Sequence, residues 1–210
     1  LAGVPIWSKD RTDLTPIVCV GGPCACNPEP IADFCDIVFL GDGEESTNQV
    51  LDLLKECKLK GSTKHEFLLK AKDIQGVYVP SFYEPSYNED ETLKELKPLF
   101  NAPEKVKKAV VSDMNKVYYP DKFVVPFINI VHDRAVEEIF RGCIRGCRFC
   151  QAGFIYRPIR EKSVETINRQ AKALIDSTGY DELSLCSLST SDHSNVNEML
   201  TSLIDWTVKD

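Results

Sequence analysis

The sequence predicts an α/β fold in three parts, on three observations. Short apolar runs alternate with stretches of helical periodicity. The runs are apolar throughout, as strands buried on both faces of a parallel sheet are. A stretch rich in proline and tyrosine interrupts the alternation. We therefore expect an α/β part over residues 1–75, a connector with strands and hairpins over 76–128, and a second α/β part over 129–210.

The first part is expected to open with two parallel strands. Residues 16–20 and 36–40 are apolar runs, and they end at Gly21-Gly22 and at Gly41-Asp42-Gly43. Only a short helix fits between them, over residues 30–34. The pattern predicts a Rossmann-like (flavodoxin-like) arrangement that is truncated.

Two longer helices are expected in the same part. Residues 44–58 carry apolar side chains at helical spacing, with acids in the first turn and lysines in the last, as the helix dipole favours. A further helix is predicted from Thr63 to Gly76, because Thr63 and Glu66 can form a capping box.

The connector is predicted to be extended. Prolines and tyrosines recur along it, and the polar segment 88–91 is typical of a hairpin turn. Residues 92–99 also fit a helix, so the sequence leaves both interpretations open for that segment.

The second α/β part returns to strands and helices with short joints. Such joints are typical of consecutive units of a parallel sheet with right-handed crossovers. The expected elements are a strand over 135–140, a helix from Ser163 to Gly179, a strand over 181–188, and a last helix capped by Ser191 or Asp192.

Parallel strands end at one edge of a sheet, so the segments that follow them face one site. A loop with Cys143, Cys147 and Cys150 follows the first of these strands. The segment Ser187-Leu188-Ser189-Thr190 follows the second. We expect the cysteine loop and this serine-rich segment to line the same site.

The spacing of the three loop cysteines predicts an iron-sulfur site. No second cysteine pair lies nearby to close a structural zinc site. A four-iron cluster held by three thiolates leaves one iron open for a substrate. The alternatives are three reduced thiols or a zinc site that recruits His132. Positive charge that favours thiolates comes from Arg141, Arg145 and Arg148.

The chain has nine cysteines, an odd number that favours free thiols plus a metal site in a reducing compartment. Cys24 and Cys26 lie near Cys35 and could bind a metal, but no histidine or fourth cysteine completes that set. Four cysteines lie in apolar stretches and are predicted to be small core residues, namely Cys19, Cys35, Cys57 and Cys186.

Composition limits the class of protein. A hydrophobic content of 43% and a charged content of 27% are those of a globular protein. The net charge of -7 weighs against a broad hold on nucleic acid. No apolar stretch reaches the roughly 20 residues of a spanning helix, and the residues from Leu1 onward do not show the basic and apolar regions of a signal peptide. We expect a cytoplasmic protein without membrane contact or strong nucleic-acid binding.

The motif Cys143-x-x-x-Cys147-x-x-Cys150, with Phe149 before its third cysteine, resembles the signature of the radical S-adenosylmethionine (radical SAM) superfamily. The likeness covers nearly the whole chain. The resemblance is to uncharacterised iron-sulfur oxidoreductases with an N-terminal cobalamin (B12)-binding-like domain. The residues that carry it are 21–23, 27–33, 41–45, 130–134, 138–140, 151–158 and 183–192.

This resemblance implies a [4Fe-4S] cluster on the three loop cysteines, with SAM chelated to the open iron. It also implies reductive cleavage of SAM to methionine and a 5'-deoxyadenosyl radical, which takes hydrogen from a substrate. Residues 129–210 would then form the first two βα units of a partial TIM barrel. A low-potential electron donor of the flavodoxin or ferredoxin type would be a partner.

The resemblance further suggests which residues contact SAM. Ser187-Leu188-Ser189 stands where the second barrel strand ends near the methionine moiety, and Phe149 is expected near adenine. Arg157 and Arg160 are candidates for the carboxylate, which a guanidinium group matches well. Each arginine could instead pair with surface acids.

For the first part, the resemblance places the nucleotide tail of cobalamin at Gly21-Gly22. The alternative is a simple turn that prepares Pro23. The Asp-x-His-x-x-Gly stretch that supplies a lower cobalt ligand is missing from the sequence, so cobalamin lacks that support. The acids after Gly41 exclude a dinucleotide loop, because pyrophosphate would have to sit at the same helix N-terminus.

We expect the chain to be a piece of a longer enzyme, with sequence missing at both ends, and to be inactive in isolation. Two other functions stay open. One is a non-catalytic iron-sulfur electron-transfer or scaffold module, and the other is a cobalamin- or partner-binding module with a vestigial cysteine loop. The substrate is not identified by the sequence.

Overall fold

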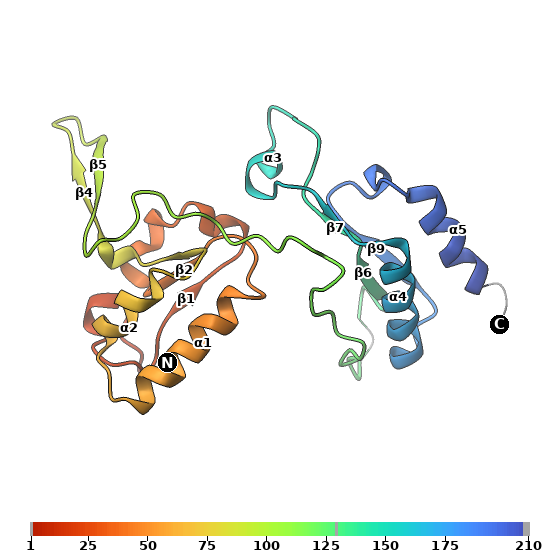
Figure 1. Cartoon of the computed structure of the whole chain (residues 1–210), viewed down its shortest axis with the longest axis horizontal. Coiled ribbons are helices and arrows are strands. Elements are labelled where there is room, and N and C mark those ends of the chain that lie inside the picture. The colour runs from red at the N-terminus through yellow and green to blue at the C-terminus, as the bar shows by residue number, and fades with distance from the viewer. Residues whose placement is uncertain (1, 129, 208–210) are drawn as a thin grey trace. The chain divides into compact units, whose positions relative to one another are not determined.

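The computed structural model describes residues 2–128 and 130–207 and shows a mixed α/β protein with small sheets. The chain divides into two compact units, residues 1–111 and 112–210 (Figure 1). The predicted connector is therefore shared between the two units. Residue 129, where the second α/β part was expected to begin, and the chain end at 210 lie outside the described ranges. No described helix is long and apolar enough to cross a membrane.

The first unit contains a three-stranded sheet in the order β1 (Cys19–Val20), β2 (Ile37–Phe39), β3 (Val77–Tyr78). The pairing of β1 with β2 is parallel, which confirms the predicted relation of the two apolar runs. The third strand is antiparallel to β2. Ile37 and Val38 are both fully buried and belong to different core clusters, so the two faces of β2 are covered.

Two α-helices, α1 (Ser46–Leu59) and α2 (Lys64–Ala71), supply one of these cores. The predicted capping box at the start of α2 is present: the Thr63 hydroxyl accepts from the Glu66 backbone, and the Glu66 carboxylate accepts from the Thr63 backbone. The helix ends at Ala71, before the expected stop at Gly76. The remaining short helices of this unit are η1 (Ser8–Asp10), η2 (Pro23–Cys26), η3 (Glu29–Phe34) and η4 (Pro80–Phe82).

Gly76 has a different role from the predicted one. Its φ is +81°, and a Cβ there would lie 2.7 Å from the Ala109 Cβ and 2.8 Å from the Ala109 backbone nitrogen. The position therefore needs glycine because a later segment of the unit crosses it closely, which helical periodicity could not reveal.

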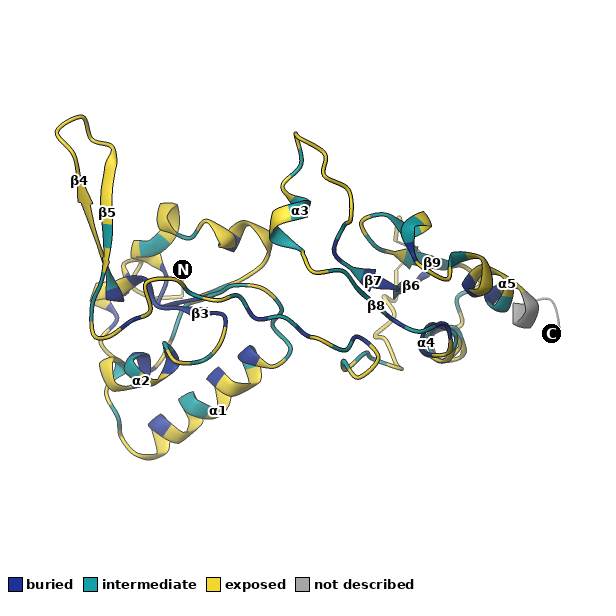
Figure 2. Cartoon of the chain, turned by 45° about the horizontal axis from the view of Figure 1, so that its top comes forward, coloured by how far each residue is buried: buried dark blue, intermediate teal, exposed yellow. Residues whose placement is uncertain are grey.

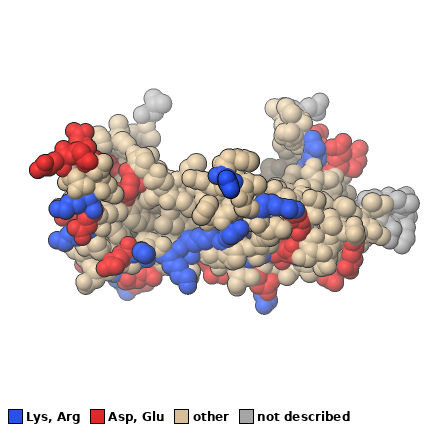
Figure 3. All heavy atoms as spheres, turned by 90° about the horizontal axis from the view of Figure 1, so that it is seen from above, with Lys and Arg blue, Asp and Glu red and all other residues tan. Residues whose placement is uncertain are grey.

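A hairpin projects from the first unit, formed by β4 (Tyr83–Tyr87) and β5 (Leu93–Pro98) in antiparallel pairing. The hairpin interpretation of this stretch is confirmed, and the helical alternative for residues 92–99 is wrong. Nearly all of the hairpin is exposed (Figure 2). Acidic side chains gather at the end of the first unit that carries it (Figure 3).

The second unit is built on β6 (Ala135–Glu138) and β9 (Leu183–Cys186), which pair in parallel. Between them lies α4 (Val164–Thr178). The Ser163 hydroxyl accepts from the Thr166 backbone at its start, and Gly179 has a left-handed φ of 73° at its end, as predicted. The other elements are β7 (Phe140–Arg141), α3 (Ala152–Ile155), β8 (Arg160–Glu161), η5 (Thr190–Asp192) and α5 (Val196–Thr207).

Two cysteines predicted for the core are exposed, whereas Cys35 and Cys57 are buried as expected. Cys19 lies on β1, an edge strand of its sheet, so part of that strand is uncovered. Cys186 ends β9, where successive side chains point to opposite faces. Leu183 and Leu185 face the helix-covered core and Cys186 faces away from it.

Candidate metal and cofactor site

The cysteine loop is an excursion closed at its base by a two-stranded ribbon. Strand β7 leads into the loop and β8 leads out of it. The two strands pair antiparallel, with Phe140 opposite Glu161 and Arg141 opposite Arg160. Residues 142–159 thus form one closed segment that begins and ends on the same ribbon.

Gly142 is the first residue of this loop, and its geometry requires glycine. Its φ is +100°, and a Cβ would lie 2.9 Å from both the Ile159 Cα and the Pro158 carbonyl oxygen. Gly146, by contrast, has open space around a built Cβ. The two ends of the loop therefore pack closely at Gly142, directly before Cys143, while the middle of the loop is open.

The three thiols lie on one loop but are not gathered. Cys143 and Cys150 are half-buried, and Cys147 is exposed. The Cys150 backbone nitrogen donates to the Cys147 carbonyl oxygen at 3.1 Å, and the Ala152 nitrogen donates to the Cys150 sulfur at 3.4 Å. Within residues 2–128 and 130–207, no three His, Cys, Asp or Glu side chains lie close enough together to hold a metal ion. The donor set fits an iron-sulfur group in residue type, since thiolates are its usual ligands.

Two of the three arginines that were expected to favour thiolates are engaged with carboxylates. Arg141 donates from Nε and Nη2 to the Glu138 carboxylate at 2.9 and 3.0 Å. Arg145 donates through its Nε to the Asp192 Oδ2 at 2.9 Å and through its Nη2 to Oδ1. The charge that was expected to favour thiolates is partly balanced by these two acids.

The Arg145–Asp192 pair joins the cysteine loop to the segment after β9. Ser189 donates from its hydroxyl to the Asp192 Oδ2 at 2.7 Å. The hydroxyls of Ser187 and Thr190 lie 2.9 Å apart, and Leu188 is 50% exposed. The loop and the serine-rich segment are thus linked through one carboxylate, consistent with the expected meeting of the segments that follow two parallel strands.

Asp192 was predicted only as a possible helix cap. The last helix begins at Val196, so neither Ser191 nor Asp192 caps it. Hydrogen bonds from Arg145 and then from Ser189 hold the pKa of Asp192 below its usual value. The same partnership raises the pKa of Arg145. The sequence did carry a signal for this contact. Asp192 stands soon after the second of two parallel strands, and an arginine-rich loop follows the first.

The other candidate contacts to SAM are placed differently. Phe149 is 92% exposed. Arg160 lies in β8 and donates from Nε to the Pro158 carbonyl oxygen at 3.1 Å. Arg157 lies 3.5 Å from the Cys143 carbonyl oxygen and 3.4 Å from that of Ile144. These two arginines therefore support the backbone of the loop.

His132, the candidate for a makeshift zinc site, is exposed. Its Nδ1 lies 3.5 Å from an Arg134 nitrogen. Cys24 and Cys26 are likewise exposed, and no metal-binding group forms around them within the described residues.

Gly21 and Gly22 lie at a local turn of the first unit. Gly22 has a φ of +98° and precedes Pro23, the first residue of η2, so it serves the turn that was the structural alternative for this motif. A built Cβ at Gly22 meets nothing within 4 Å, and one at Gly21 lies 3.6 Å from the Phe39 Cβ.

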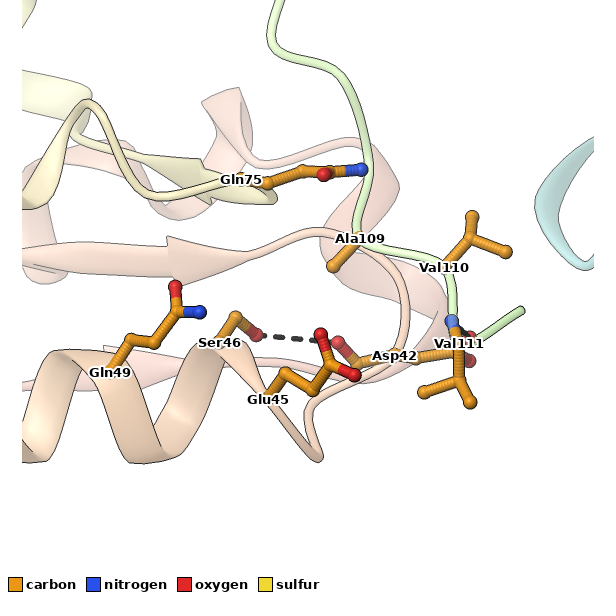
Figure 4. Close-up of a pocket in the computed structure, with 8 residues that line it drawn as sticks. All are labelled: Asp42, Glu45, Ser46, Gln49, Gln75, Ala109, Val110 and Val111. Atoms are coloured by element: carbon orange, nitrogen blue, oxygen red, sulfur yellow. Dashed lines mark hydrogen bonds between the residues drawn. The ribbon is translucent and has the colours of Figure 1, made fainter. Parts of the chain in front are cut away.

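The loop after β2 binds a later segment of its own unit (Figure 4). A Cβ at Gly41 would lie 2.1 Å from the Ala109 carbonyl oxygen. The Asp42 Oδ2 accepts from the Val111 backbone nitrogen at 2.8 Å, and the Asp42 carbonyl accepts from the Ser46 hydroxyl at 3.3 Å. A cavity of about 70 Å³ remains beside these residues. The glycine and the acid thus fix the place where the later segment crosses this loop.

A buried ion cluster lies beside β2. The Asp36 side chain is fully buried and contacts the Arg11 Nε at 3.0 Å, the Lys64 Nζ at 2.6 Å and the Ser8 hydroxyl at 2.5 Å. Burial alone would raise the pKa of Asp36, but these hydrogen bonds and one from the Val18 nitrogen together lower it. A cavity of about 770 Å³ in the same unit is lined in part by Arg11 and Lys64, whose charged groups are already held by Asp36.

A second buried ion pair lies under α4. Lys162 Nζ contacts Glu137 Oε1 at 2.8 Å, and their side chains are 1% and 0% exposed. Gln170 also accepts from Lys162 at 2.8 Å, and the Tyr119 ring centroid lies 3.9 Å from Nζ. Among the residues that the structure describes, none hydrogen-bonds to the other oxygen of Glu137, Oε2. Burial raises the pKa of Glu137 despite the lysine.

Comparison with known proteins relates the first part of the chain to a known class of protein. Residues 1–80 match the family model described as "Radical SAM proteins, N-terminal". This match supports a relationship of the chain with the radical SAM superfamily. The matched description does not mention cobalamin, so cobalamin binding stays a prediction.

A particular relative matches along most of the chain. It is "Uncharacterized protein MJ0966" of Methanocaldococcus jannaschii, which is 26% identical over 193 residues. The matched region makes up 91% of this chain and 36% of the relative. The chain therefore spans about a third of the length of the curated relative that it matches.

Proposed function

We propose that the chain carries part of the active site of a radical SAM enzyme, in which Cys143, Cys147 and Cys150 hold a [4Fe-4S] cluster. The observation that carries this proposal is a single closed loop with three thiols, linked to the end of a neighbouring parallel strand. The family match of residues 1–80 supports it independently of the cysteines.

When bound, such a cluster supplies the electron that cleaves SAM to methionine and a 5'-deoxyadenosyl radical. The three thiolates would bind metal and leave one coordination position open. The backbone N–H of Ala152, which already points at the Cys150 sulfur, would stabilise negative charge on that thiolate. Gly142 would keep the first cysteine close to the ribbon.

The remaining residues have proposed roles in binding SAM. Ser187-Leu188-Ser189 would line the methionine side, and Phe149 would lie near adenine. Arg160, in β8, would contact the carboxylate. Gly21-Gly22 stays a proposed cobalamin contact, with the turn before Pro23 as the simpler function.

The wider proposal concerns the whole enzyme. The first unit would belong to a Rossmann-like, cobalamin-binding-like domain, and the second would begin a partial TIM barrel. We propose an oxidoreductase or transferase type of reaction in the cytoplasm, with an electron donor of the flavodoxin or ferredoxin type.

Anaerobic reconstitution of the full-length polypeptide that contains these residues tests the proposal. We expect about four iron atoms per chain and an electron paramagnetic resonance signal that changes when SAM is added. Alanine at all three loop cysteines should abolish both. Cys24→Ala/Cys26→Ala is the matched control, because both thiols are exposed outside the loop.

Each outcome is decisive for one part of the proposal. A full-length protein without a cluster, or a cluster lost equally in the control, would overturn the assignment of the loop. If the cluster forms but its signal does not change when SAM is added, the result would instead support an electron-transfer module.

A further inference from the structure

The contact between Arg145 and Asp192 is the most specific link between the two walls of the candidate site. Arg145 lies between the first two cysteines of the loop. Its guanidinium group donates to both carboxylate oxygens of Asp192, and Ser189 donates to Oδ2 as well. Such fork-like pairing fixes orientation, which a single point charge does not.

The Asp192 end of this contact is anchored. Its side chain is 10% exposed, and its backbone nitrogen donates to the Ser189 carbonyl at 2.8 Å. The next residue, His193, is 3% exposed. The His193 Nδ1 accepts from the Asn195 nitrogen at 3.1 Å, so Nε2 carries the ring proton and donates to the Lys162 carbonyl at 3.1 Å.

The Arg145 end is more open. The Arg145 side chain is 61% exposed, and Cys147 beyond it is exposed too. The base of the loop is fixed by the β7–β8 ribbon and by the close packing at Gly142. Arg145 is therefore placed to tie the open middle of the loop to the anchored segment that bears Asp192.

We propose that Arg145 and Asp192 form a latch that sets the position of the cysteine loop relative to Ser189. Both are positioning residues and neither is a metal ligand. This inference rests on the proposed function, because it concerns where SAM would lie between the cysteines and the serine-rich segment. A small error in such placement is costly for a bound reactant.

An isolated surface ion pair contributes little, and three features distinguish this one. The contact is bidentate, the Asp192 side chain is only 10% exposed, and a third hydrogen bond from Ser189 completes the network. The substitution Arg145→Lys keeps the positive charge but loses the two-pronged hydrogen bonding, so this variant should keep only part of the affinity for SAM.

The test compares Arg145→Gln, Arg145→Lys and Asp192→Asn in the full-length protein. The matched control is Asp176→Asn, which removes one acid from an exposed i,i+4 pair with Lys172 on α4. Two measurements are made on each: SAM affinity from titration of the reconstituted cluster signal, and hydrogen exchange of residues 142–150 in the metal-free protein.

We expect iron content to be retained and SAM affinity to fall roughly tenfold in Arg145→Gln and Asp192→Asn, with Arg145→Lys in between. Hydrogen exchange across residues 142–150 should be faster in Arg145→Gln and in Asp192→Asn than in Asp176→Asn. The double substitution Arg145→Asp/Asp192→Arg, which swaps the two partners, should recover part of the affinity for SAM.

Two failures are distinguishable. A cluster that forms in every variant with SAM affinities equal to that of Asp176→Asn overturns the latch alone. The absence of a cluster from the unsubstituted protein overturns the proposed function, and with it the role of the latch in placing SAM.

Discussion

Gly142→Ala tests whether the base of the cysteine loop is built as described. The glycine has a φ of +100°, which costs an alanine about 1 kcal/mol. The added Cβ would also lie 2.9 Å from the Ile159 Cα and the Pro158 carbonyl oxygen, and both are backbone atoms. Such overpacking costs about 2 kcal/mol. We expect a loss of about 3 kcal/mol in the free energy of unfolding.

The assay is urea unfolding of the 210-residue chain, followed by circular dichroism. For a unit of this size, a slope of about 1.5 kcal/mol per molar urea makes the expected loss a decrease of about 2 M in midpoint. The matched control is Gly146→Ala in the same loop. Its Cβ meets nothing within 4 Å, and Gly146 is not among the glycines of positive φ.

The control should change stability by less than about 0.5 kcal/mol. If Gly142→Ala and Gly146→Ala unfold at the same urea concentration, the close packing of the two loop ends is refuted. Because Cys143 follows Gly142, the variant should also hold less iron after reconstitution than the control.

Three further substitutions address other features. Lys162→Met leaves the Glu137 carboxylate buried without its cation and should lower the free energy of unfolding by about 3 kcal/mol, measured by urea unfolding; adding Glu137→Gln should recover part of the loss. The lowered pKa of Asp36 means that its stabilisation is present above the ordinary value of 3.8 and is lost as pH falls through the folded-state pKa. The variant Asp36→Asn should therefore have a lower free energy of unfolding at neutral pH, and that free energy should change less as the pH falls. If the pH dependence of unfolding is the same as in the unsubstituted protein, this explanation is contradicted. Gly179→Ala meets no clash and should cost about 1 kcal/mol in thermal unfolding, from its left-handed φ alone.

Local signals in the sequence predicted many of the elements. The capping box at Thr63, the cap at Ser163 and the left-handed stop at Gly179 all depend on residues within one helix. The parallel pairs also followed from short apolar runs, since a strand buried on both faces must be apolar throughout.

Contacts between distant segments could not be predicted in the same way. The glycines at 41 and 76 are required by Ala109, which lies far along the chain. No periodicity reports such a crossing. The buried pairs Arg11 with Asp36 and Lys162 with Glu137 were missed for the same reason, because burial of a charge is decided by its tertiary partners.

The sequence predicted the two segments of the candidate site but not the contact between Arg145 and Asp192 that joins them. Cysteine spacing identified the loop, and strand order predicted that the serine-rich segment would meet it. The contact that joins them depends on Asp192, which the helix pattern had suggested as a cap. A helix cap and an ion-pair partner have the same residue type, so sequence alone could not choose between them.

Cys143, Cys147 and Cys150 are proposed to bind a cluster and to leave one metal position open to SAM. The most direct measurement is electron-nuclear double resonance on the reconstituted, reduced full-length protein with SAM labelled by oxygen-17 in its carboxylate. We expect hyperfine coupling between the label and the cluster, and this coupling should be lost when the three cysteines are replaced by alanine. A cluster that shows no coupling to labelled SAM would contradict the proposal.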